Sequence, residues 1–229
     1  MRHSVLAALA LAGLVTPARA ATVAIPASQD TTLVEDPNGA LANGAGPAIF
    51  AGRTAASDDG VRRGLVVFDL VQGLPAIPPT AMSVEKVVLV LTNLTESNVA
   101  PAEYRLHRML ADWGEGTSSS SGGAGAAATP GDATWIHTFY AEAFWMHNGA
   151  QFVGQPSARL VLAGPGVLRF ESDALLRDVR FWARHPERNF GWILIGDETR
   201  AQTARAFASR ENPAPALRPV LEVTYRGRP

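Results

Sequence analysis

Aromatic and histidine side chains gather in one stretch of the sequence, between positions 113 and 147. Flat aromatic faces stack on sugar rings, and amphipathic rings add a hydrogen bond. The residues that could form such a carbohydrate-binding platform are Trp113, Trp135, His137, Tyr140 and Trp145. The alternative is a small core beneath a loop, because large aromatic side chains are mostly buried in folded proteins. A platform requires two or three of these rings to be exposed.

Carboxylates and histidines of the same region are the candidates for catalysis. Asp112, Glu115 and Asp132 offer carboxylates, and His107 and His137 could act as bases. Glycoside hydrolysis requires two carboxylates at a set separation across a cleft. The sequence contains no nucleophile elbow, phosphate-binding loop or zinc-protease motif. It therefore favours a non-catalytic protein over a polysaccharide lyase or hydrolase.

Oxygen ligands in the turns after the first strand-like segments suit a calcium ion. Asp30, Asp36 and Asn38 are the candidate ligands, because Ca²⁺ prefers carboxylate and amide oxygens. Asp36-Pro-Asn-Gly39 also has the composition of a plain turn, and the spacing differs from that of an EF-hand loop. Zinc is disfavoured, since the chain has no cysteine and its histidines lack the H-E-x-x-H spacing.

Four charged residues lie in or beside apolar segments: Arg63, Asp69, Arg210 and Glu211. A charge survives in such surroundings only when it is paired. We therefore expect arginine–carboxylate pairs that hold strand ends together, including a pair between Arg210 and Glu211. The alternative is that these side chains line a polar ligand cleft.

Short segments of alternating apolar and polar residues, separated by Gly, Pro, Asn and Asp, position these side chains. This pattern is typical of an all-β protein. One-sided strands of this kind pack as two antiparallel sheets over a shared core. The predicted strands are Ala21–Ile25, Thr31–Glu35, Ala48–Gly52, Arg63–Leu70, Val84–Thr92, Tyr104–Leu110, Val167–Glu171, Phe190–Ile195, Ala204–Ser209 and Pro219–Tyr225.

Two further segments interrupt the strand pattern. A helix is predicted over about Asp173–Arg184, because Leu175, Val179 and Trp182 recur at helical spacing after a capping Ser172 or Asp173. Residues 117–131 consist mainly of Ser, Gly and Ala. Such a composition buries little apolar surface, so we expect a flexible loop inserted within one domain.

Residues 1–20 have the features of a secretory signal peptide. A basic start at Arg2 precedes the apolar run Val5–Val15, and Ala18-Arg-Ala20 supplies the small residues that a signal peptidase needs. The apolar run is shorter than the ~20 residues of a membrane span. We therefore expect cleavage near Ala20 and a secreted protein, extracellular or periplasmic, without a transmembrane anchor.

The remaining residues, 21–229, are predicted to form a single domain. The chain has no cysteine, so stability outside the cell must come from packing or from a bound metal. The formal net charge is −1, and removal of residues 1–20 makes it slightly more acidic. This argues against a nucleic-acid binder, which needs a basic face. Nothing in the sequence indicates the oligomeric state.

Motifs spread over residues 29–225 resemble the DNRLRE domain family of exported bacterial and archaeal β-sandwich modules, some of which are grouped with carbohydrate-binding modules. Their order and spacing carry the resemblance, and the string that names the family is absent. Ser209-Arg-Glu211 followed by Arg218-Pro219 occupies the comparable region. The other matching segments are Gln29–Leu33, Leu41–Ala45, Phe50–Arg53, Arg62–Asp69, His107–Gly116, Gly131–Trp135, Arg180–Trp182 and Asn189–Asp197.

The resemblance implies a jelly-roll-like antiparallel β-sandwich with one short helix packed on it. It also implies, less directly, binding to an extracellular or cell-wall polysaccharide without catalysis. A structural or adhesive module of the cell surface or matrix is the alternative, because a fold does not by itself specify a function.

Overall fold

The computed structural model describes residues 20–75, 82–95 and 100–227. The predicted signal peptide therefore lies outside the described residues, apart from Ala20. Every strand pairing among the described residues is antiparallel, which confirms the expected all-β sandwich. The strands are β1 (Ala20–Val34), β2 (Leu41–Ala42), β3 (Ala48–Arg53), β4 (Val61–Phe68), β5 (Met82–Asn93), β6 (Ala102–Arg108), β7 (Ala126–Ala127), β8 (His137–Phe139), β9 (Ala143–Phe144), β10 (Ala158–Leu162), β11 (Gly166–Phe170), β12 (Trp192–Ile195), β13 (Arg205–Ala208) and β14 (Val220–Gly227).

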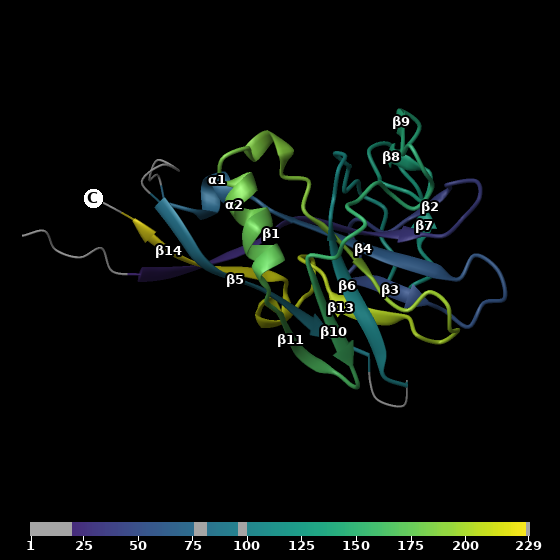
Figure 1. Cartoon of the computed structure of the whole chain (residues 1–229). Coiled ribbons are helices and arrows are strands. Elements are labelled where there is room, and N and C mark those ends of the chain that lie inside the picture. The colour runs from purple at the N-terminus through teal and green to yellow at the C-terminus, as the bar shows by residue number, and fades with distance from the viewer. Residues whose placement is uncertain (1–19, 76–81, 96–99, 228–229) are drawn as a thin grey trace, which may run out of the picture.

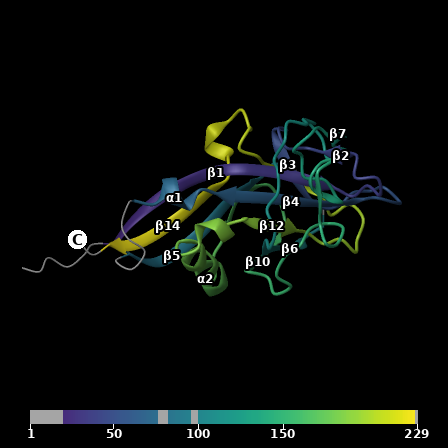
Figure 2. The same ribbon diagram turned by 90° about the horizontal axis from the view of Figure 1, so that it is seen from above.

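Strand β1 joins the two layers of the sandwich. Its first half, Ala20–Pro26, pairs with β14, and its second half pairs with β4 after a register shift between Ala27 and Gln29. The first layer contains β11, β5, β14, β13 and β3, and the second contains β4, β12, β6 and β10. Figure 2 shows β1 running along both β14 and β4.

The main core lies between the layers. Side chains of β4 and β12 point alternately to the two faces of the second layer. Val66 and Trp192 face the main core, whereas Leu65 and Ile193 face the opposite side. Successive strand residues point to opposite faces of a sheet. Strand β12 is buried at all four positions because both of its faces are covered.

A second hydrophobic cluster, which we call the outer core, covers the far face of the second layer. It is formed by Leu33, Leu65, Val67, Met109, Trp113, Ala133, Trp145, Ala150, Ile193 and Ile195. Its cover comes from the long connection between β6 and β10. Figure 1 shows this connection, with β8 and β9, at the end of the molecule away from α1 and α2.

Helix α2 (Asp173–Trp182) begins at its predicted residue and ends two residues before Arg184. The Ser172 hydroxyl accepts a hydrogen bond from the Leu175 N–H at 3.0 Å, and Leu175, Val179 and Trp182 are buried. The sequence pattern did not predict the short helix α1 (Leu70–Gly73) or strand β10. Two single turns of 3-10 helix, Pro186–Arg188 and Pro215–Leu217, complete the secondary structure of the described residues.

The Ser/Gly/Ala segment 117–131, expected to be a flexible loop, lies against the sandwich in this structure. Strand β7 within it pairs with β2, and Ser118 is buried. The Ser120 N–H donates to Asn43 Oδ1 at 2.7 Å, and the Ala45 N–H donates to the Ser118 carbonyl at 2.8 Å. Backbone and amide hydrogen bonds therefore hold a segment that has few apolar side chains.

Candidate functional site

Three of the five predicted sugar-binding rings are packed inside the protein. Trp113, Trp145 and His137 are 2%, 5% and 7% exposed. Each tryptophan N–H is also satisfied internally: Trp113 Nε1 donates to the Phe190 carbonyl and Trp145 Nε1 to the Thr134 carbonyl, both at 2.9 Å. Trp113 and Trp145 belong to the outer core beneath the connection, which is the alternative that the sequence left open.

The two remaining rings are only partly exposed. Arg63 lies over the Trp135 ring at 4.8 Å from its centroid, and the same guanidinium group forms a two-point ion pair with Glu198 at 2.7 and 2.9 Å. Tyr140 meets the His137 ring edge-on, with centroids 5.1 Å apart. The five residues thus do not form an exposed stacking platform.

The predicted calcium ligands separate into two places. Asp36 accepts hydrogen bonds from the backbone N–H groups of Asn38 at 3.1 Å and Ala40 at 2.6 Å, so its carboxylate closes its own turn. Asn38 is exposed. Asp30 lies elsewhere, fully buried beside Glu115 and Glu211.

The Asp30 cluster, composed of Asp30, Glu115, Arg210 and Glu211, connects three distant segments of the chain. Arg210 binds Glu115 through Nε and Nη2 at 2.7 and 2.9 Å, and its Nε lies 2.9 Å from Glu211 Oε1. The Arg210 N–H donates to Asp30 Oδ2 at 2.7 Å, and the Asp30 N–H donates to Glu115 Oε1 at 2.8 Å. The expected Arg210–Glu211 pair is present, together with a partner, Glu115, that local spacing did not indicate.

Burial dominates the electrostatics of this cluster. It raises the pKa of Asp30 well above the usual value, although the hydrogen bond from the Arg210 N–H opposes the shift. Burial likewise raises the pKa of Glu211, and the charge of Arg210 acts in the other direction. Hydrogen bonding to Glu115 raises the pKa of Arg210, so the guanidinium group remains charged.

The other two predicted ion-pair residues do not bind each other. Arg63 pairs with Glu198, which is 135 positions away. Asp69 is the N-cap of α1: its Oδ1 accepts from the N–H groups of Val71 at 2.9 Å and Gln72 at 3.0 Å. Strand β4 ends at Phe68, so Asp69 begins the helix and its carboxylate satisfies free N–H groups there.

The carboxylates considered for catalysis each have hydrogen-bond partners of their own. Glu115 is bound by Arg210, and Asp132 is fully buried and accepts hydrogen bonds from the N–H groups of Thr129 at 2.6 Å and Ser118 at 3.3 Å. Asp112 lines a cavity.

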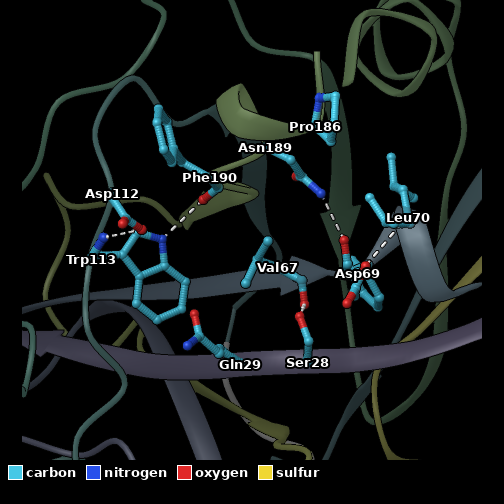
Figure 3. Close-up of a pocket in the computed structure, with 12 residues that line it drawn as sticks. Ser28, Gln29, Val67, Asp69, Leu70, Asp112, Trp113, Pro186, Asn189 and Phe190 are labelled. Carbon is cyan, nitrogen blue, oxygen red and sulfur yellow. Dashed lines mark hydrogen bonds between the residues drawn. The ribbon is translucent and has the colours of Figure 1, made fainter. Parts of the chain in front are cut away.

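A cavity of about 370 Å³ lies where β1, the end of β4 and α1 meet the segments around Trp113 and Phe190. Figure 3 shows Asp112 and Asp69 on opposite sides, with Val67 and Ser28 between them. Val71, Pro186 and Phe190 supply apolar wall, and Gln29 supplies an amide. Polar groups that fix orientation within an apolar wall are typical of small-ligand sites.

Several polar atoms of the cavity are available to a ligand. The exposed Gln29 amide has no hydrogen bond within the described part of the chain, and Asp112 uses Oδ1 for the Trp113 N–H at 2.9 Å while its Oδ2 remains free. Ser28 and Asn189 are engaged with the carbonyls of Val67 and Phe68. Sequence reasoning missed Gln29 and Asn189, because nothing in local spacing places residues 29, 69, 112 and 189 together.

No family model and no curated protein matches this chain. Among the described residues, no helix is long and apolar enough to cross a membrane.

Proposed function

We propose that this protein is an exported, non-catalytic β-sandwich module that binds an extracellular or cell-wall polysaccharide. The cavity at Gln29 and Asp112 carries the proposal, because it combines free hydrogen-bonding groups with apolar wall in about 370 Å³, a volume within the range of small-ligand pockets. The resemblance to DNRLRE domains and the signal-peptide pattern of residues 1–20 point in the same direction.

The charge of the cavity favours a neutral polysaccharide. The described residues that line it include two carboxylates, Asp69 and Asp112, and no lysine or arginine. Carboxylate oxygens accept hydrogen bonds from sugar hydroxyl groups, and such charge-assisted bonds are stronger than neutral ones. The same carboxylates repel the uronate groups of acidic polysaccharides. The bound sugar is therefore expected to be uncharged.

Affinity gel electrophoresis of the purified protein tests this proposal with soluble neutral glucans, xylans and mannans, and with alginate and polygalacturonate. We expect retardation by at least one neutral polysaccharide and none by the acidic pair. Gln29→Ala and Asp112→Ala should each weaken binding about tenfold, since each removes a hydrogen bond to the sugar. Glu142→Ala, which changes an exposed turn remote in sequence from the cavity residues, is the matched control.

The absence of retardation by any polysaccharide would exclude the proposal. Wild-type retardation of both cavity variants would place binding at another surface. Near-ultraviolet circular dichroism of each variant checks that the tryptophan side chains remain packed as in the wild type.

An adhesive or structural module is the second candidate, and an exposed apolar tip favours it. Phe144, in β9, and Met146, two residues later, are 66% and 75% exposed. Contiguous exposed apolar surface marks protein contact sites. If the module self-associates through this tip, sedimentation velocity should show oligomers that the double variant Phe144→Ser, Met146→Ser lacks. A monomer at all concentrations would contradict self-association.

A further inference from the structure

Two buried carboxylate oxygens in the Asp30 cluster have no hydrogen-bond partner. They are Asp30 Oδ1 and Glu211 Oε2. Asp30 is completely buried, and its carboxylate lies among those of Glu115 and Glu211, with one oxygen of each residue within 4.8 Å of the others. A buried carboxylate oxygen without a donor or a cation is costly.

The charges of the cluster do not balance. Three carboxylates and one guanidinium group give a net charge of −2 (1 − 3) when all are ionised. Arg210 is already committed to Glu115 through two nitrogens and to Glu211 Oε1. It therefore leaves the free oxygens of Asp30 and Glu211 without a hydrogen-bond donor, although the charge of Arg218 also acts on Glu211.

We propose that this cluster binds a hard divalent cation, Ca²⁺, between Asp30 and Glu211 and beside Glu115. Ca²⁺ is coordinated by carboxylate oxygens at about 2.3–2.6 Å, a distance that oxygens within 4.8 Å of one another can supply to a shared ion. A charge of +2 neutralises the excess. Glu211 and Arg210 have side chains 24% and 39% exposed, so water can reach this edge and complete the coordination shell.

The bound ion would hold three segments together that are far apart in sequence. Asp30 belongs to β1, Glu115 follows β6, and Glu211 follows β13. An ion that binds the folded protein and not the unfolded chain stabilises the fold by mass action. This inference does not rest on the proposed polysaccharide binding, because no residue of the Asp30 cluster is among the residues that line the cavity.

The test compares thermal unfolding of the whole purified protein in EDTA and in excess Ca²⁺. We expect Tm to rise by about 5 °C or more at ~100 times Kd, and isothermal titration calorimetry to show one site. Asp30→Asn keeps an oxygen for the Arg210 N–H but removes the charge. It should fold in EDTA with a Tm equal to or above that of the wild type, and it should lose the response to Ca²⁺.

Two further variants keep the test decisive. Glu211→Gln should also lose the response, which provides a second reading if Asp30→Asn does not fold. Asp58→Asn, in an exposed turn, should respond as the wild type does. The proposal is overturned if Ca²⁺ changes neither Tm nor the calorimetric heat, or if Asp30→Asn and Glu211→Gln keep the wild-type shift.

Discussion

At the scale of single residues, Arg210 has more partners than its place in the sequence indicates. Its guanidinium group binds Glu115 and Glu211, and its backbone N–H binds Asp30. The side chain of Glu115, which Arg210 binds, is only 14% exposed. Removal of one member of a buried ion pair is more costly than the pair's net contribution, because the other charge remains buried.

Arg210 is 39% exposed, so the pair is only partly buried, and Arg210→Leu should lower the free energy of unfolding by about 1–3 kcal/mol, measured by urea denaturation in EDTA. Arg226→Leu is the control, since Arg226 pairs with Glu85 at 2.9 Å with a side chain 52% exposed. Its loss should be about 0–1 kcal/mol. If Arg210→Leu costs no more than the ~0.5 kcal/mol of an ordinary surface change, Arg210 does not anchor the cluster.

At the scale of elements, helix α2 is fastened to the sandwich through Asp178 as well as through its apolar face. The Asp178 carboxylate accepts from Trp192 Nε1 at 3.0 Å and from the Ser157 hydroxyl, and it lies 3.2 Å from Arg108 Nε. Trp192 is fully buried and stacks edge-on against Trp182 of α2 at 4.5 Å. The half-buried Asp178 side chain thus joins the helix to β12, to β6 and to Ser157.

Asp178→Ala and Asp178→Asn distinguish the contribution of the Trp192 hydrogen bond from that of the Arg108 ion pair. The alanine variant leaves the buried Trp192 N–H without an acceptor and should lower the free energy of unfolding by about 1–3 kcal/mol. The asparagine variant keeps a carbonyl oxygen for Trp192 and loses the Arg108 pair, so its loss should be smaller. Equal losses in urea denaturation would mean that the ion pair, not the Trp192 hydrogen bond, carries the contribution.

The elements also show how far the sequence predicts this fold. Alternation over 84–92 and 219–225 predicted β5 and β14, and the spacing of Leu175, Val179 and Trp182 predicted α2. Strand β1 was predicted as two strands, because Pro26 and the polar residues 28–30 interrupt the alternation. The strand stays continuous where it changes partner from β14 to β4, with a register shift. Strand β10, at an edge, was missed because its apolar residues 160–162 follow one another and show no alternation.

The sites were less predictable than the strands because their partners are distant in sequence. The sequence indicated that Arg63, Arg210 and Glu211 need ion-pair partners, but Glu198 and Glu115 reach them only through the strand order. Burial of Trp113 and Trp145 likewise depends on the connection folding back over the second layer. Composition alone suits both a sugar platform and a small core.

At the scale of the whole molecule, the strands form a nearly continuous enclosure. β1 pairs with β14 and β4, and β5, β13 and β3 complete the path between them. The core enclosed in this way has no disulfide to support it. Global stability therefore depends on packing and on the charge state of the groups buried at the sheet surfaces.

His107 is one such group, and it faces positive charge. It is 5% exposed on β6, and its Nδ1 donates to the Val153 carbonyl at 2.9 Å, which fixes the neutral tautomer. Burial lowers its pKa below the usual 6.5, the Val153 hydrogen bond opposes the shift, and the charges of Arg105, Arg63 and Arg159 lower the pKa further. Protonation of His107 therefore costs more in the folded protein than in the unfolded chain.

The sign of the pH dependence follows from this difference. Below about pH 6.5 the unfolded chain binds a proton at His107 that the folded protein does not, so acidification favours unfolding. The stability due to neutral His107 is complete above that pH and is lost as the pH falls towards the lowered pKa. Between pH 7.5 and 5, the free energy of unfolding should fall more in the wild type than in His107→Gln. His147→Gln, which changes an exposed histidine, should follow the wild type. Superimposable pH profiles for wild type and His107→Gln would show that His107 titrates alike in both states.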